Sequence, residues 1–169
     1  MKGLTVFLVF AAMMISCQSE MSLSKFIALN ENKPGFKSFT ISSNALKIRV
    51  GETDPELKEA LDNIKTIQLL VYNSEDRTVE EMNGYAKQAT DVVKGERYES
   101  MMEIVKDGQA FYISARKKGD KFQEIVLLGS GEDAFFLGRI MGEMEVDKGI
   151  KLMQAIDFSQ MAQGISLDL

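Results

Sequence analysis

The stretch that decides the fold is residues 98–146, YESMMEIVKDGQAFYISARKKGDKFQEIVLLGSGEDAFFLGRIMGEMEV, which predicts four consecutive β-strands joined by short turns. Asp107-Gly108 follows the first strand, and this pair between apolar runs is a strong hairpin signal because both central turn residues take positive φ. Lys118-Gly119-Asp120 marks the next turn. The expected strands of this antiparallel meander are Tyr98–Lys106, Gln109–Arg116, Phe122–Leu128 and Ala134–Val146.

The segment before the meander predicts the main helix of the fold, Thr78–Lys94. Thr78 and Glu81 have the spacing of a capping box, which satisfies free N–H groups at a helix start. Gly95 stands where a glycine commonly ends a helix. One apolar stripe at helical spacing is formed by Val79, Met82, Ala86, Ala89 and Val93.

The N-terminal half predicts two further strands, Phe36–Ser42 and Ile64–Tyr72, and a short helix, Leu23–Leu29. A last helix is expected over Asp147–Ile156. Together these elements predict one α+β domain, in which an antiparallel sheet of about six strands is packed by one main helix and shorter helices. No repeat, linker or composition shift divides the chain.

Composition narrows the functional classes. The chain has 169 residues, 45% of them hydrophobic, with a formal net charge of −5 and no histidine. An acidic chain without a basic cluster is a poor match for nucleic acid. Without histidine, or a recognisable pair of nucleophile and base, the sequence favours a protein that is not an enzyme.

The candidate ligand sites in the sequence are weak. Gly129-Ser130-Gly131 does not fit a phosphate-cradling loop, because such loops lead into a helix, whereas a strand and the acidic pair Glu132-Asp133 follow here. Acidic groups such as Glu143 and Glu145 carry oxygen ligands suited to calcium, but none has EF-hand spacing. We therefore expect no metal and no cofactor.

The N-terminus carries the signals of an exported protein. Lys2 precedes the apolar run Leu4–Ile15, which is shorter than the about 20 residues that a transmembrane helix needs. Cys17, the sole cysteine, follows Ser16 directly. An ordinary signal peptide and a core helix with a buried cysteine are the alternatives. The pattern predicts a signal peptide over residues 1–16, a tether over residues 17–22 and a single domain over residues 23–169.

The run Met14-Ile15-Ser16-Cys17 resembles the lipobox of bacterial lipoproteins. The resemblance implies that Cys17 is acylated and that the leader is removed before it. The protein would then face the periplasm or the cell surface, held to the envelope membrane by lipid.

Several further segments accompany the Cys-ended leader. They are Leu23–Ser43 (with Pro34-Gly35-Phe36 and Phe39-Thr40-Ile41-Ser42-Ser43), Ile64–Tyr72, Tyr98-Glu99-Ser100-Met101-Met102-Glu103 before Asp107-Gly108, and Ile140-Met141-Gly142-Glu143-Met144-Glu145-Val146. Together they resemble the DUF4252 family of Bacteroidetes lipoproteins, a family of unknown function. The resemblance covers most of the chain after the leader and implies no catalytic residue.

One pattern in the meander points toward binding. Its first and last strands carry apolar residues on both faces, whereas a sheet with helices on one face should alternate more cleanly. We expect Met101, Leu137 and Met141 to line a surface that docks an envelope protein or an apolar ligand. The alternative is that the apolar tail Asp157–Leu169 covers them. The sequence thus favours an interaction or sensory module, with a carrier or chaperone for an apolar ligand as the second reading.

Overall fold

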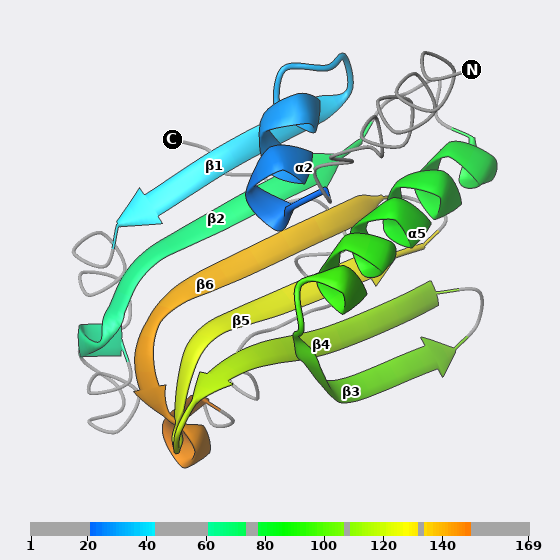
Figure 1. The fold of residues 1–169 in the computed structure, drawn as a ribbon. Coiled ribbons are helices and arrows are strands. Elements are labelled where there is room, and N and C mark those ends of the chain that lie inside the picture. The colour runs from blue at the N-terminus through cyan, green and yellow to red at the C-terminus, as the bar shows by residue number, and fades with distance from the viewer. Residues whose placement is uncertain (1–20, 43–60, 74–77, 107–108, 132–133, 150–169) are drawn as a thin grey trace, which may run out of the picture.

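The computed structural model describes residues 21–42, 61–73, 78–106, 109–131 and 134–149. They form one antiparallel sheet of six strands in the order β1-β2-β6-β5-β4-β3, with helices α2 and α5 on one of its faces (Figure 1). The strands are β1 (Phe36–Ser42), β2 (Ile64–Tyr72), β3 (Glu99–Lys106), β4 (Gln109–Lys118), β5 (Lys121–Ser130) and β6 (Phe135–Glu145). This architecture confirms the predicted α+β class and the four-stranded meander β3–β6.

Several strand boundaries agree closely with the sequence. β1 and β2 have the predicted bounds, while β4 and β5 each extend further than the periodicity indicated. Gly129 and Ser130 belong to β5, because both pair with β6. The turn between β4 and β5 is as expected, with Gly119 at φ 62°.

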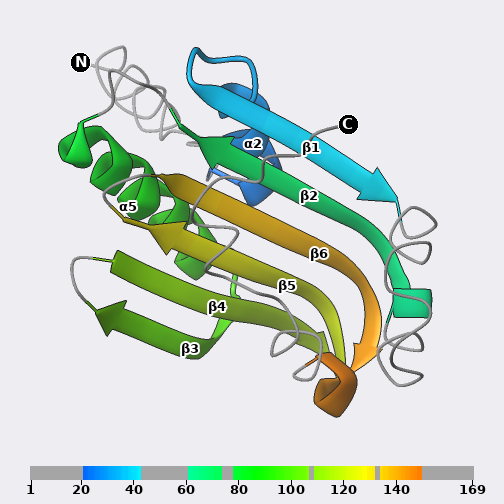
Figure 2. The ribbon, with the colours of Figure 1, turned by 180° about the vertical axis from the view of Figure 1, so that it is seen from behind.

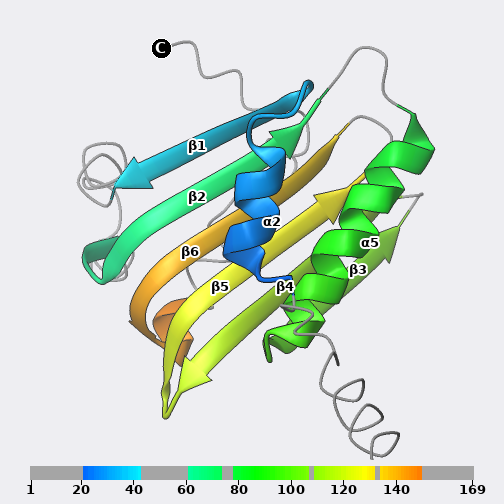
Figure 3. The ribbon, with the colours of Figure 1, turned by 45° about the horizontal axis from the view of Figure 1, so that its top comes forward.

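Helices α2 (Leu23–Asn30) and α5 (Val79–Gly95) cross the same face of the sheet (Figure 3). The predicted capping box is present: the Thr78 hydroxyl accepts from the Glu81 N–H, and the Glu81 carboxylate accepts from the Thr78 N–H. The stripe of α5 is mostly buried, except that Val79 is exposed. Helix α5 ends at Gly95, as predicted, and the left-handed residue of the turn that follows is Arg97, at φ 61°.

Both faces of the sheet carry a buried apolar cluster. The helix-side cluster packs the sheet against α2 and α5, and its members include Leu23, Phe26, Leu70, Met82, Val93, Leu128, Phe135 and Leu137. The opposite face, seen in Figure 2, has a second buried cluster that includes Ile64, Ile113, Ala115, Phe122, Ile125, Leu127, Phe136 and Ile140. Two-sided burial accounts for the apolar residues on both faces of β5 and β6.

The sheet bends at one end, past the helices (Figure 1). Register shifts occur there between Ile64 and Thr66, between Arg116 and Lys117, and between Phe122 and Glu124. A β-bulge inserts a residue on one strand and increases local twist and bending, so shifts at a common end curl the sheet there. At the bend, no helix among the described residues covers the face that α2 and α5 cover elsewhere.

Some predicted features lie outside the described residues. These are the leader with Cys17, the turn Asp107-Gly108 and the tail Asp157–Leu169. Residues 146–149 are helical, which agrees with the start of the predicted last helix.

The close approach of β6 to the start of β2 generates a stability prediction. A Cβ added at Gly142 would lie 2.3 Å from the carbonyl oxygen of Asn63, a backbone atom that cannot move aside freely. We expect Gly142→Ala to destabilise the protein by about 1–3 kcal/mol, as for other overpacked sites. Urea unfolding of the purified protein measures the change.

Gly84, inside α5, provides the matched control, because an added Cβ there meets nothing within 4 Å. Gly84→Ala should stabilise the protein by about 0.5–1 kcal/mol, since alanine is the better helix former. Equal effects of the two substitutions would contradict the close packing of β6 on residue 63.

Candidate functional site

The three residues predicted to form a docking surface do not lie together. Leu137 is fully buried beneath the helices. Met141 lies on the same face but stands opposite Glu124, at the edge of a polar hollow. Met101 is next to a bulge in β3 and packs against the buried cluster of the other face. The expected common surface is therefore corrected, because both faces of the sheet are packed and the bulge separates Met101 from the other two.

Exposed apolar side chains gather instead on β3, which forms one edge of the sheet. Met102, Ile104 and Val105 are 47%, 49% and 66% exposed. An edge strand offers unpaired backbone N–H and C=O groups, so apolar side chains beside it mark a place where another chain can add a strand. Sequence alternation alone missed this area because it does not show which strand ends the sheet.

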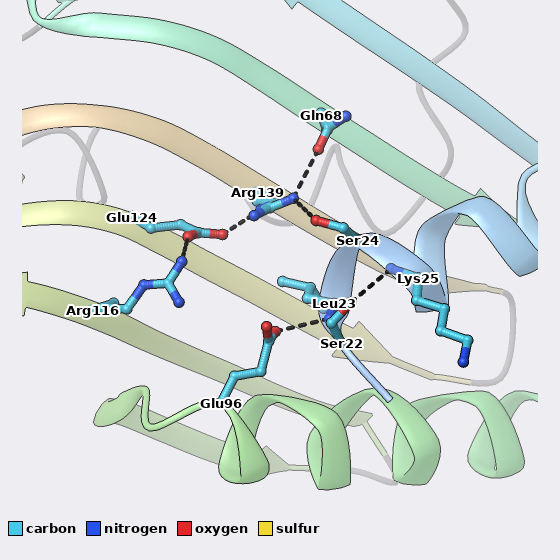
Figure 4. Close-up of polar contacts among 9 residues, drawn as sticks. All are labelled: Ser22, Leu23, Ser24, Lys25, Gln68, Glu96, Arg116, Glu124 and Arg139. Atoms are coloured by element: carbon cyan, nitrogen blue, oxygen red, sulfur yellow. Dashed lines mark hydrogen bonds and ion pairs between the residues drawn. The ribbon is translucent and has the colours of Figure 1, made fainter. Parts of the chain in front are cut away.

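The most organised polar group of the described residues surrounds Glu124, on the helix side of β5 (Figure 4). The Glu124 side chain is 4% exposed, and its carboxylate forms ion pairs with Arg116 of β4 and Arg139 of β6. The two arginines flank it because β5 lies between β4 and β6. Two guanidinium groups around one buried carboxylate leave a net charge of +1 in this network.

Arg139 extends the network to the N-terminal helix. One of its terminal nitrogens donates to the Ser24 hydroxyl of α2 at 2.9 Å and to the Gln68 side-chain oxygen of β2 at 3.3 Å. Nearby, the Glu96 carboxylate accepts from the Leu23 N–H at 2.8 Å. The first turn of α2, whose initial N–H groups lack partners within the helix, is thus fixed to both the sheet and the end of α5 (Figure 4).

Tyr98, the residue directly before β3, also contacts this network. The Arg116 guanidinium lies 4.9 Å from the centre of the Tyr98 ring, a cation–π distance. The Tyr98 hydroxyl is buried beside Glu124, although within the described residues it makes no hydrogen bond of good geometry. Burial raises the pKa of Tyr98, and the adjacent Glu124 carboxylate raises it further. The phenol therefore stays neutral and is not a base at neutral pH.

Opposing effects act on Glu124. Burial alone would raise its pKa, but hydrogen bonds and the positive charges of Arg139 and Arg116 outweigh burial and hold the pKa below its ordinary value. The carboxylate is thus ionised at neutral pH and is satisfied by its partners. In this state the carboxylate ties β4, β5 and β6 together through its two ion pairs.

Two hollows adjoin this network, and Arg116 lines both. The first, which we call the tether hollow, has a volume of about 530 Å³ and is lined by Met21, Ser22 and residues at the end of α5. The second, the basic hollow, has a volume of about 580 Å³ and lies at the bend of the sheet. Its cationic lining residues are Lys65, Arg116, Lys117, Lys118 and Arg139, and its acidic ones are Glu124 and Glu143.

The remaining chemistry of the described residues is sparse. In the ranges that the structure covers, no three His, Cys, Asp or Glu side chains gather closely enough to hold a metal ion. Of the helices it describes, none is long and apolar enough to cross a membrane.

The Glu124 network generates a second stability prediction. Glu124→Gln removes the charge but keeps the shape, leaving Arg139, itself only 13% exposed, without its carboxylate. We expect a loss on the order of 3 kcal/mol, because breaking a buried ion pair leaves an uncompensated charge. The exposed Lys87–Asp91 pair provides the control, and Asp91→Asn should leave the urea midpoint unchanged.

The same variant tests the pH dependence. Because the pKa of Glu124 is lowered in the folded state, the unfolded state binds more protons as the pH falls through the carboxyl range. The stability that Glu124 contributes is complete above its unfolded pKa and is lost as the pH falls toward its folded pKa. The free energy of unfolding, measured between pH 7 and pH 3, should therefore fall more steeply with falling pH for the unsubstituted protein than for Glu124→Gln. Parallel curves would contradict the ionised network.

Comparison with known proteins places the chain in a family. No curated protein and no solved structure matches it. A family described as "Domain of unknown function (DUF4252)" matches residues 30–152. That range includes all six strands and α5, together with Tyr98, Arg116, Glu124 and Arg139, while most of α2 precedes it. The chain belongs to the DUF4252 family.

Proposed function

We propose that this chain is an exported lipoprotein of the bacterial cell envelope, anchored through Cys17, whose domain is a non-enzymatic interaction module. The observation that carries the proposal is the β3 edge, where Met102, Ile104 and Val105 are exposed beside a side of the strand that no other described strand pairs with. Exposed apolar residues on a sheet edge recognise an extended segment of another protein by strand addition.

The N-terminal architecture supports anchoring. Gln18 to Ser22 is the only chain between Cys17 and α2, and at about 3.5 Å per residue it reaches at most about 18 Å. The start of α2 is held by Glu96 and by Arg139 through Ser24. A short tether joined to a fixed helix keeps the domain beside the bilayer, where it meets other envelope proteins first. Two or three acyl chains are sufficient for stable attachment, because each buried CH₂ contributes about 0.8 kcal/mol.

The anchoring is tested at Cys17. We expect the mature protein to begin at this residue and to carry acyl mass, and Cys17→Ser to incorporate no labelled fatty acid and to leave the membrane fraction. Ser19→Ala, which alters the same segment and keeps the thiol, should behave as the unsubstituted protein. Intact-mass analysis and cell fractionation provide the measurements. A mature protein that starts elsewhere, or that lacks acyl mass, would refute the anchor.

The interaction is tested at the sheet edge. A photo-crosslinking amino acid at position 105 should give covalent adducts with one or a few envelope proteins in intact cells. The same group at Gln88, an exposed position on α5, provides the control and should give none of these adducts. Adducts at both positions, or at neither, would contradict a docking role for β3.

A further inference from the structure

We propose that the basic hollow binds a phosphate group, and that its source is the headgroup of an anionic membrane phospholipid. The lipid source rests on the proposed anchoring at Cys17. The phosphate chemistry does not, because it follows from charge and geometry within the described residues.

The basic hollow carries positive charge that the described residues do not compensate. Lys117 pairs with Glu99 at 2.9 Å, and Glu143 pairs with Lys121 at 3.3 Å. Lys65 and Lys118, by contrast, have no ion-pair partner among the described residues. This local excess of positive charge contrasts with the formal net charge of the chain, which is −5.

The Arg116 guanidinium is already oriented before an anion binds. Its guanidinium is fixed by the Glu124 carboxylate on one side and by the face of Tyr98 on another. Its side chain nevertheless remains 42% exposed, so its other N–H groups are accessible from the hollow. A guanidinium that is already oriented loses little conformational entropy on binding, and its fork matches two phosphate oxygens. Glu124 does not repel the ligand strongly, because it is buried and outnumbered by two arginines.

The number of cations favours phosphate over a simpler anion. Arg116, Lys65 and Lys118 border one concavity of about 580 Å³, and a phosphate group presents several charged oxygens to them. A single carboxylate would be satisfied by the guanidinium alone. A long polyanion such as nucleic acid would meet the acidic remainder of the surface and be repelled.

The position of the basic hollow relative to Cys17 favours a membrane lipid as the source of the phosphate group. Arg116 also lines the tether hollow, together with Ser22, the cap residue of α2. Ser22 lies within about 18 Å of an acylated Cys17, by the reach of the tether. Anchoring through Cys17 therefore holds this side of the domain at the headgroup layer, where lysine and arginine side chains are attracted to anionic lipids.

Selective lysine labelling tests the proposal on the full chain. The protein is purified in a neutral detergent and exposed briefly to an amine-acylating reagent, and peptide mass spectrometry measures the labelling rate of each lysine. Micelles doped with phosphatidylglycerol should protect Lys65 and Lys118 about fivefold, the factor expected for one lysine at an anionic surface. Phosphatidylcholine should protect them much less. Because lipid is added to micelles, this arm works whether or not Cys17 is acylated.

Lys37 is an internal control in every sample. It is exposed on β1 and pairs in register with Val71, a member of the buried cluster on the face opposite the hollow. Its labelling rate should not change. A variant control is Lys118→Glu, which should abolish the protection of Lys65, whereas Lys37→Glu should leave it intact.

Each remaining outcome counts against part or all of the proposal. Equal protection by millimolar inorganic phosphate, at matched ionic strength, would keep the phosphate site and overturn the lipid source. Protection of Lys37 to the same extent would show a general charge effect and overturn the site. Absence of protection in every arm would overturn it as well. None of these outcomes depends on the Cys17 experiment, so the two proposals fail separately.

Discussion

A carboxylate buried in an apolar sheet requires compensation, and Glu124 obtains it from both neighbouring strands. Without Arg116 and Arg139 the charge would cost several kcal/mol of stability, so the two arginines must stay beside it whenever the domain is folded. Through Arg139 the requirement extends to Ser24 on α2 and Gln68 on β2. A single charge thereby fixes the N-terminal helix to the sheet, although most of that helix precedes the residues that match the family.

The bend of the sheet and the network occupy the same place for a structural reason. The bulge between Phe122 and Glu124 sets the latter opposite Met141, with Arg139 on the neighbouring position of the same face. Curvature at this end also carries the strands out from beneath α2 and α5, so neither of these two helices covers their polar face there. The basic hollow therefore follows from the bulges. The ion pairs around Glu124 leave one net positive charge there, in addition to the charges of Lys65 and Lys118.

Much of the fold follows from local patterns. Alternation located β1 and β2, and the capping box at Thr78 located the start of α5. Part of the network had a signal in the sequence, but its pairing did not. The hairpin turn alone would set Arg116 opposite Gln123, and the register shift beside Lys117 moves it opposite Glu124. A lone glutamate in the run Phe122–Leu128 was the signal. The pairing of β2 with β6 was not within reach, because it joins segments far apart in the sequence. Without it the helix-covered face of Leu137 could not be identified, nor could β3 be recognised as an edge.

The strand order also affects the order in which the chain folds during its synthesis. The meander β3–β6 forms entirely between neighbours in sequence, whereas β2 leaves the ribosome long before its partner β6 exists. Closing that long loop costs entropy that local hairpins avoid, so the hairpin β1–β2 is expected to join the sheet late. Until it does, the β6 edge lies open with Phe136 and Ile140 beside it. During that interval the open edge exposes apolar strand surface, and a holding chaperone would be most useful there.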